Sequence, residues 1–165
     1  MEPTANISDA IIEALYERAL MLADDVRAAF ALRPASEAMA ARETDPLALA
    51  LSEEGLRTTT RMMHALAWLL NQRAYLAGEM TEFQLRRHGA LPDDCPSDPD
   101  LVMLLELPTQ ELIEETEALH SRLTRLDRAW RERFEMRPPA IMRLRDRLGL
   151  AMTAEQRRHE RWGVR

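Results

Sequence analysis

The sequence predicts an all-α fold. Glycine occurs only five times, and Ala, Leu, Glu and Arg dominate while Val, Ile and aromatic residues are scarce, which favours helix over sheet. Three long stretches repeat apolar residues at steps of three and four, as one helical face requires. We expect an antiparallel three-helix bundle over residues 1–136, with a long linker and a short extra helix, followed by a flexible arginine-rich tail over 137–165.

The first predicted helix begins after Ser8, a good N-cap, and ends near Pro34. Residues 33–49 contain two prolines and no sustained period, so we expect a long linker there. The apolar face of this helix is predicted to comprise Ile12, Leu15, Ala19, Leu22, Val26 and Ala29.

The second predicted helix follows Ser52 and has two different faces. An apolar face of more than half the cylinder is typical of a helix with two neighbours, so we expect it to form the core. The opposite face is polar apart from Trp68. The predicted core stripe is Leu56, Thr60, Met63, Ala67, Leu70 and Ala74, with Thr59, Met62, Leu66, Leu69 and Leu76 beside it.

The connection to the third helix contains a short helix and a loop. Thr81 and Gln84 bracket a capping box, TEFQ, and Gly89 should end the helix that it opens. Prolines and aspartates predict a loop over residues 92–100. The apolar segment 101–107 fits either a helical turn or an extended strap.

The third predicted helix begins at Thr109, after Pro108, and ends before Pro138. Its acidic residues lie early and its arginines late, which complements the helix dipole. Its apolar stripe is Leu112, Thr116, Leu119, Leu123, Leu126 and Trp130.

Composition excludes several classes of protein. The longest uncharged run in the second helix is too short for a bilayer, and the N-terminus has no export pattern, so we expect a cytoplasmic protein. We also expect the protein to be concentrated at a cell pole. Cys95 is the single cysteine and cannot form an internal disulfide. All 22 basic residues are arginine, which excludes lysine Schiff-base chemistry and a Walker-type phosphate loop.

Catalytic and metal-binding patterns are weak. Glu117 and His120 have the Glu-x-x-His spacing of di-iron bundles, but no second copy exists, so a surface pair is expected. The aspartates of 93–100 lack the central glycine and closing glutamate of an EF-hand, so we expect a solvated loop. We therefore predict no enzyme activity, no metal and no cofactor.

The polar face of the second helix is the main candidate site. Trp, Tyr and Arg dominate binding hot spots, which favours a partner surface, although the 33–49 linker or the 101–107 segment could instead cover Trp68. The basic tail is a second candidate, with a solvated chain end as the alternative. The candidate partner-binding residues are Arg57, Arg61, His64, Trp68, Gln72 and Tyr75, together with Arg157 and Arg158 in the tail.

The stretch EGLRTTTRMMHALAWLLNQRAYLAGEMT, with LDRAW in the third helix, resembles the alphaproteobacterial family named regulator of CtrA degradation. The resemblance is specific over about residues 52–82 and diffuse over the other two helices. The matching positions are Thr59, Arg61, Met62, Met63, Trp68, Leu69, Leu70, Gln72, Arg73, Ala74, Gly78, Glu79 and Met80.

The resemblance implies a non-enzymatic, dimeric adaptor. Members help deliver CtrA and other substrates to the ClpXP protease, working with the response regulator CpdR and the cyclic-di-GMP effector PopA. The alternative from another class is a helical nucleic-acid-binding regulator that uses the arginine tail. Residues 1–136 carry 14 arginines against 25 acidic residues, and this acidic body would repel nucleic acid.

Overall fold

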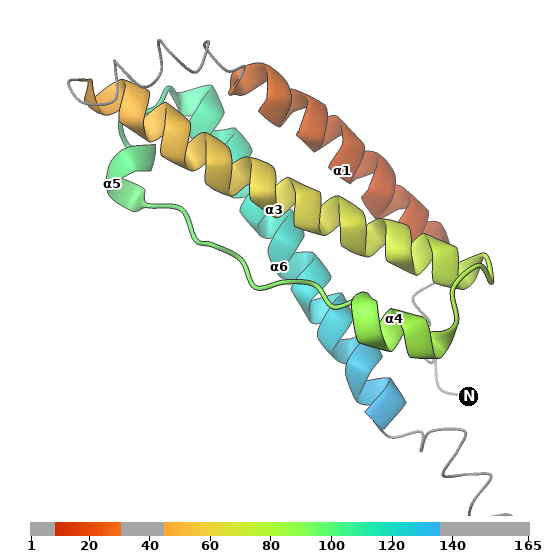
Figure 1. The fold of residues 1–165 in the computed structure, drawn as a ribbon. Helices are drawn as coiled ribbons and strands as arrows, with labels where there is room; N and C mark the ends of the chain where they lie inside the picture. Colours follow the sequence, from red (N-terminus) through yellow and green to blue (C-terminus); the bar gives the residue numbers. More distant parts are fainter. Residues whose placement is uncertain (1–8, 31–44, 136–165) are drawn as a thin grey trace, which may run out of the picture. The chain divides into compact units, whose positions relative to one another are not determined.

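The computed structural model describes residues 9–30 and 45–135, with side chains up to residue 132. These residues form helices and connections without a strand, which confirms the all-α class (Figure 1). The predicted linker over residues 33–44 and the tail over 137–165 lie outside the described residues. The helices are α1 (Asp9–Ala29), α3 (Pro46–Leu76), α4 (Glu82–His88), α5 (Pro99–Val102) and α6 (Leu107–Glu135).

The chain divides into two compact units, Met1–Asp127 and Arg128–Arg165, so the division falls within α6. A domain boundary at 136/137 stays a prediction. Among the described residues, no helix combines the length and apolar character needed to cross a membrane.

Helix α1 buries the face that its sequence predicts. Five of the six expected positions are buried, and only Ala29, in the last turn, is exposed. Their spacing puts them on one side of the cylinder because an α-helix turns once in 3.6 residues. The buried positions are Ile12, Leu15, Ala19, Leu22 and Val26.

Helix α3 is longer than predicted. It begins at Pro46 rather than after Ser52, so residues 46–49 belong to the helix and not to a linker. The side chain of Asp45 accepts a hydrogen bond from the backbone N–H of Leu47 at 3.0 Å. Proline is tolerated at the first helical position because its missing N–H would have no partner there. Local capping thus starts this helix despite the proline.

The connection from α3 to α6 contains two short helices. The Thr81–Gln84 capping box is present and Gly89 caps the end of α4, as predicted. Residues 101–105 form the end of α5 and a turn, so the apolar segment is a helical turn and not an extended strap. Gly78 has φ 76°, a left-handed conformation that glycine adopts without strain, and it turns the chain after α3.

Helix α1 runs opposite to α3, whereas α3 and α6 run in the same direction. Arg61 of α3 contacts Thr116 of α6, and further along both helices Trp68 contacts Asp127. The connection returns along the length of α3 before α6 begins (Figure 1). The antiparallel arrangement is therefore present for α1 with α3 but not for α3 with α6.

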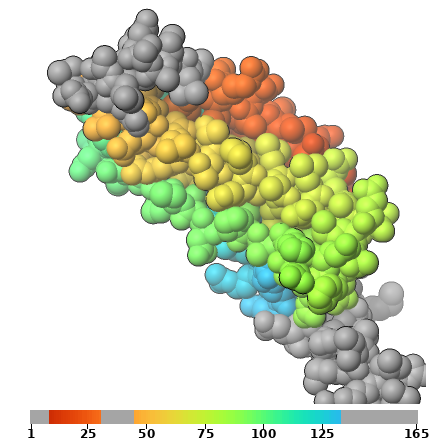
Figure 2. Space-filling view, in the orientation of Figure 1, coloured from red at the N-terminus to blue at the C-terminus, as the bar shows by residue number. Residues whose placement is uncertain are grey.

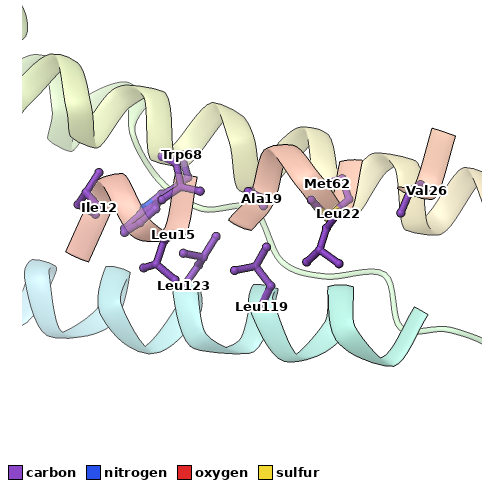
Figure 3. Packing of buried hydrophobic residues seen from close by; sticks show 11 residues of the cluster. Ile12, Leu15, Ala19, Leu22, Val26, Met62, Trp68, Leu119 and Leu123 are labelled. Carbon is purple, nitrogen blue, oxygen red and sulfur yellow. The ribbon is translucent and has the colours of Figure 1, made fainter. Parts of the chain in front are cut away.

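One apolar cluster draws on these three helices (Figure 3). Leu15 from α1, Met62 and Trp68 from α3, and Leu123 from α6 all belong to it. The predicted stripe of α6 also holds, since Thr116, Leu119, Leu123 and Trp130 are buried while Leu112 and Leu126 are partly buried.

Leu69 and Leu70 give a matched test of how α3 faces the core. Leu69 is fully buried, whereas Leu70 is 47% exposed. Leu69→Ala should lower the free energy of unfolding by about 2–5 kcal/mol because it leaves a cavity. Leu70→Ala should change it by less than about 0.5 kcal/mol, the usual range for surface positions. Urea denaturation at a concentration where the chain is monomeric measures both, and a larger loss at Leu70 would contradict this orientation.

Candidate functional site

Helix α3 faces the core with a side that mixes polar and apolar residues. The predicted core stripe is exposed, with Leu56 at 68%, Met63 at 65% and Leu70 at 47% of their accessible surface. Ala67 is also exposed, while Thr60 and Ala74 are half-buried. The prediction that this stripe forms the core is therefore wrong. The buried stripe is Ala50, Glu54, Thr58, Arg61, Ala65, Trp68 and Gln72, flanked by Gly55, Met62 and Leu69.

Arg61 is 1% exposed, so it is not the surface residue that its charge suggests. Its Nε donates to both carboxylate oxygens of Asp94 at 2.9 Å. One terminal nitrogen donates to the hydroxyl of Thr116 at 3.1 Å, and the other donates to Glu117 at 3.3 Å. A planar guanidinium with five N–H donors suits this arrangement because one group can satisfy several acceptors.

The same guanidinium holds the connection between α4 and α5. It donates to the backbone carbonyl of Cys95 at 3.1 Å and to the hydroxyl of Ser97 at 3.3 Å. Glu117 also accepts from the backbone N–H of Ser97 at 3.3 Å. Arg61 therefore joins α3 to both the connection and α6, and no spacing in the sequence indicated these partners.

A second buried charge lies two turns earlier on α3. Glu54 is fully buried, pairs with Arg57, and accepts from the backbone N–H of Asp98 at 3.0 Å. The hydrogen bond to Glu54 is the main cause that raises the pKa of Arg57 above its usual value. Arginine is cationic at every physiological pH in any case, so Arg57 itself gives no pH switch near neutrality.

Trp68 is a core residue and not a docking residue. It is 1% exposed, belongs to the main apolar cluster, and donates its indole N–H to Asp127 at 2.9 Å. Gln72 is buried one turn later. The side of α3 around Arg61 and Trp68 is covered by α6 and by the connection at 94–97, whereas residues of the 101–107 segment pack near Ala50, at the start of α3. Residues 33–44 lie outside the described part.

The predicted partner surface is therefore not one surface. Arg61, Trp68 and Gln72 are buried, and this corrects their assignment to an exposed face. The remaining predicted residues of α3 are half-buried, and they are Arg57, His64 and Tyr75. The tail residues, Arg157 and Arg158, lie outside the described residues.

Glu117 and His120 are not the surface pair that we expected in the absence of a second Glu-x-x-His. His120 is 3% exposed, and Glu117 is engaged by Arg61. The aspartate loop is not simply solvated, because Asp94 pairs with Arg61 and Asp98 caps α5. Within the described ranges, no group of three or more His, Cys, Asp or Glu side chains is arranged to hold a metal ion.

Removing the Arg61 guanidinium should be strongly destabilising. In Arg61→Ala, the carboxylates of Asp94 and Glu117 lose their buried cation, which should lower the free energy of unfolding by roughly 3–5 kcal/mol. Thermal and urea unfolding measure the loss. Arg18→Ala is the control because its pair with Glu115 is half exposed on both sides and should be worth less than about 1 kcal/mol. Equal effects of the two changes would show that Arg61 has no special structural role.

The hydrogen bond from Trp68 to Asp127 can be tested separately from the packing of the indole. Trp68→Phe keeps an aromatic ring but removes the donor, and should cost about 1.5–3 kcal/mol, as for a hydrogen bond to a charged group. The measurement is a double-mutant cycle with Asp127→Ala, which removes the acceptor and should be non-additive with Trp68→Phe because the two residues touch. Additive losses would mean that the hydrogen bond contributes nothing to stability.

Comparison with known proteins places the chain in a family without assigning a function. No curated protein and no solved structure matches the sequence. The sequence profile of the family described as "Protein of unknown function (DUF1465)" matches residues 4–152. This match covers all of the described helices and most of the chain. The protein therefore belongs to the DUF1465 family.

Proposed function

We propose that this protein is a non-enzymatic, homodimeric adaptor that helps deliver CtrA-like cell-cycle regulators to the ClpXP protease. The observation that supports the proposal best is the exposed apolar stripe of α3, which lies within the segment that resembles the regulator of CtrA degradation family. CpdR and PopA are the proposed co-adaptors in this delivery. An adaptor needs binding surfaces rather than a catalytic pocket, and an exposed apolar face on a charged protein is such a surface.

The exposed apolar stripe of α3 is continuous and uncharged. Leu56, Met63 and Leu70 are spaced by seven residues on the side of α3 opposite Arg61 and Trp68. The yellow part of α3 is uncovered between α1 and the green connection in the face shown by Figure 2. Formally charged residues make up 30% of the chain, so a stripe without charge over two heptads is unusual for a solvated helix face.

The stripe is self-complementary, which favours a second copy of this chain as its occupant. A twofold axis through Met63 would pair Leu56 of one copy with Leu70 of the other, and Met63 with itself. Thr60 and Ala67 are small and alternate with the larger residues, so two helices can approach closely. Steps of seven also suit two helices that cross at a shallow angle.

Dimerisation would serve delivery by doubling the remaining surfaces. Two weak contacts on one assembly act at a high effective concentration, so a cargo bound by one copy stays near a protease bound by the other. The arginine-rich tail with Arg157 and Arg158 is the second proposed surface, and a pull-down with and without residues 137–165 tests it.

Met63→Glu tests the stripe by placing charges at the proposed dimer axis. The wild type should be a dimer by light scattering at roughly 50 μM, a concentration suited to a modest homodimer, and Met63→Glu should be a monomer with unchanged helical content. Degradation of CtrA by ClpXP with CpdR and PopA should be faster when the wild-type protein is added than when it is omitted. Met63→Glu should lose most of this acceleration.

Met21→Glu is the matched control, since Met21 is 58% exposed on α1 and receives the same change. It should leave both mass and degradation rate as in the wild type. A monomeric wild type would rule out self-association through α3. A dimer that fails to accelerate degradation in the complete system would instead rule out the adaptor function.

A further inference from the structure

A pocket of about 310 Å³ lies between the connection and α6. Its volume is at the small end of pockets that hold ligands, which suits the end of one side chain rather than a whole metabolite. We name it the His120 pocket. Its lining includes Leu91, Asp93, Asp94, Glu117, His120 and Thr124.

His120 lines this pocket, and one nitrogen of its ring has no hydrogen-bond partner among the described residues. The hydroxyl of Thr124 donates to the backbone carbonyl of His120 at 2.9 Å, so its oxygen is left to accept from Nδ1 of the imidazole, which lies 3.5 Å away. This arrangement favours the tautomer in which Nδ1 carries the proton and Nε2 is an acceptor. Nε2 is buried and has no hydrogen-bond partner among the described residues. A buried acceptor without a donor is costly, so a ligand that donates would be favoured.

The charged groups of the pocket are also acceptors. Asp93, Asp94 and Glu117 contribute three carboxylates, and Arg61, with one positive charge, pairs with Asp94 and Glu117. Asp127 also lines the pocket, but it accepts the indole N–H of Trp68 and has further interactions. Arg125 lies at the rim, where it donates to Ser121 at 3.0 Å without lining the pocket.

We propose that the His120 pocket binds the guanidinium group of an arginine side chain from a partner polypeptide. Guanidinium carries only donors, in a planar fork, and the pocket offers carboxylate oxygens and an imidazole nitrogen to accept from it. The chain itself already contains such an interaction, since Asp94 and Glu117 together bind the guanidinium of Arg61. A second arginine would reduce the net charge of the three carboxylates and Arg61 from −2 to −1.

Arg61 also prepares the pocket for this ligand. It holds Asp94 through both oxygens of its carboxylate, and it holds one oxygen of Glu117. Fixed carboxylates lose little freedom when a ligand binds, which favours affinity. That the arginine belongs to a protein partner rests on the proposed adaptor function, whereas the binding of guanidinium does not.

Binding can be measured on the full chain with small probes. N-acetylarginine methylamide is titrated while NMR follows the imidazole signals of His120 and the backbone amides of Ser121 and Thr124. The shifts should saturate. N-acetylcitrulline methylamide has nearly the same shape without the charge and should bind about tenfold more weakly or worse, because hydrogen bonds between charged groups are worth that factor.

Two substitutions with matched controls locate the site. Ser121→Phe fills the pocket from an exposed position and should abolish the saturable shifts, whereas Ala118→Phe, exposed on α6 but outside the lining, should not. Asp93→Asn removes one charge from the rim and should weaken binding severalfold, while Asp25→Asn on α1 should have no effect. Circular dichroism checks that each variant keeps its helices.

Three outcomes would overturn the proposal. They are the absence of saturable shifts, equal binding of the citrulline and arginine probes, and binding that survives Ser121→Phe. The last would mean that arginine associates only with the acidic surface at large. Because no protease is present, failure here leaves the delivery assay untouched, and failure of delivery leaves this binding result untouched.

Discussion

The structure depends on the buried guanidinium of Arg61. An isolated ion in a protein interior costs several kcal/mol, so Arg61 can face the core only if acceptors meet it there. Asp94 from the connection and Thr116 and Glu117 from α6 supply them. For Asp94 to reach Arg61, the chain must return along α3 after α4, and this return makes α6 begin beside the start of α3. The parallel direction of α3 and α6 is thus tied to one ion-pair network.

Burial of the network also determines which surface α3 presents to solvent. The side that contains Arg61 and Trp68 is used in the core, so the apolar side that contains Leu56 and Met63 is exposed. A charged face would keep the helix solvated without a partner, whereas this exposed apolar face suits the proposed association. The orientation of α3 therefore has two consequences. Its polar residues stabilise the core, and its apolar residues are available for the proposed association.

The carboxylates of Asp94 and Glu117 lie between two environments. Arg61 pairs with both of them, and both also line the His120 pocket. Groups that are fixed for structural reasons are well suited to binding, because the ligand does not have to order them. The pocket and the α3 stripe are formed by different residues, so one molecule could use both at once, as an adaptor requires.

The sequence by itself determined the all-α class, the core faces of α1 and α6, the capping box of α4 and its end at Gly89. Each depends on residues within a few turns of one another, so local spacing and capping are sufficient.

The core face of α3 was decided only by tertiary structure. Two stripes of this helix share the same rhythm of three and four residues, one through Leu56 and Met63 and the other through Arg61 and Trp68. Hydropathy favours the first, but acceptors 33 to 56 residues further along the chain make the second the buried one. Local periodicity carries no information about such distant partners, so the orientation of α3 and the pocket beside it follow from the folded chain alone.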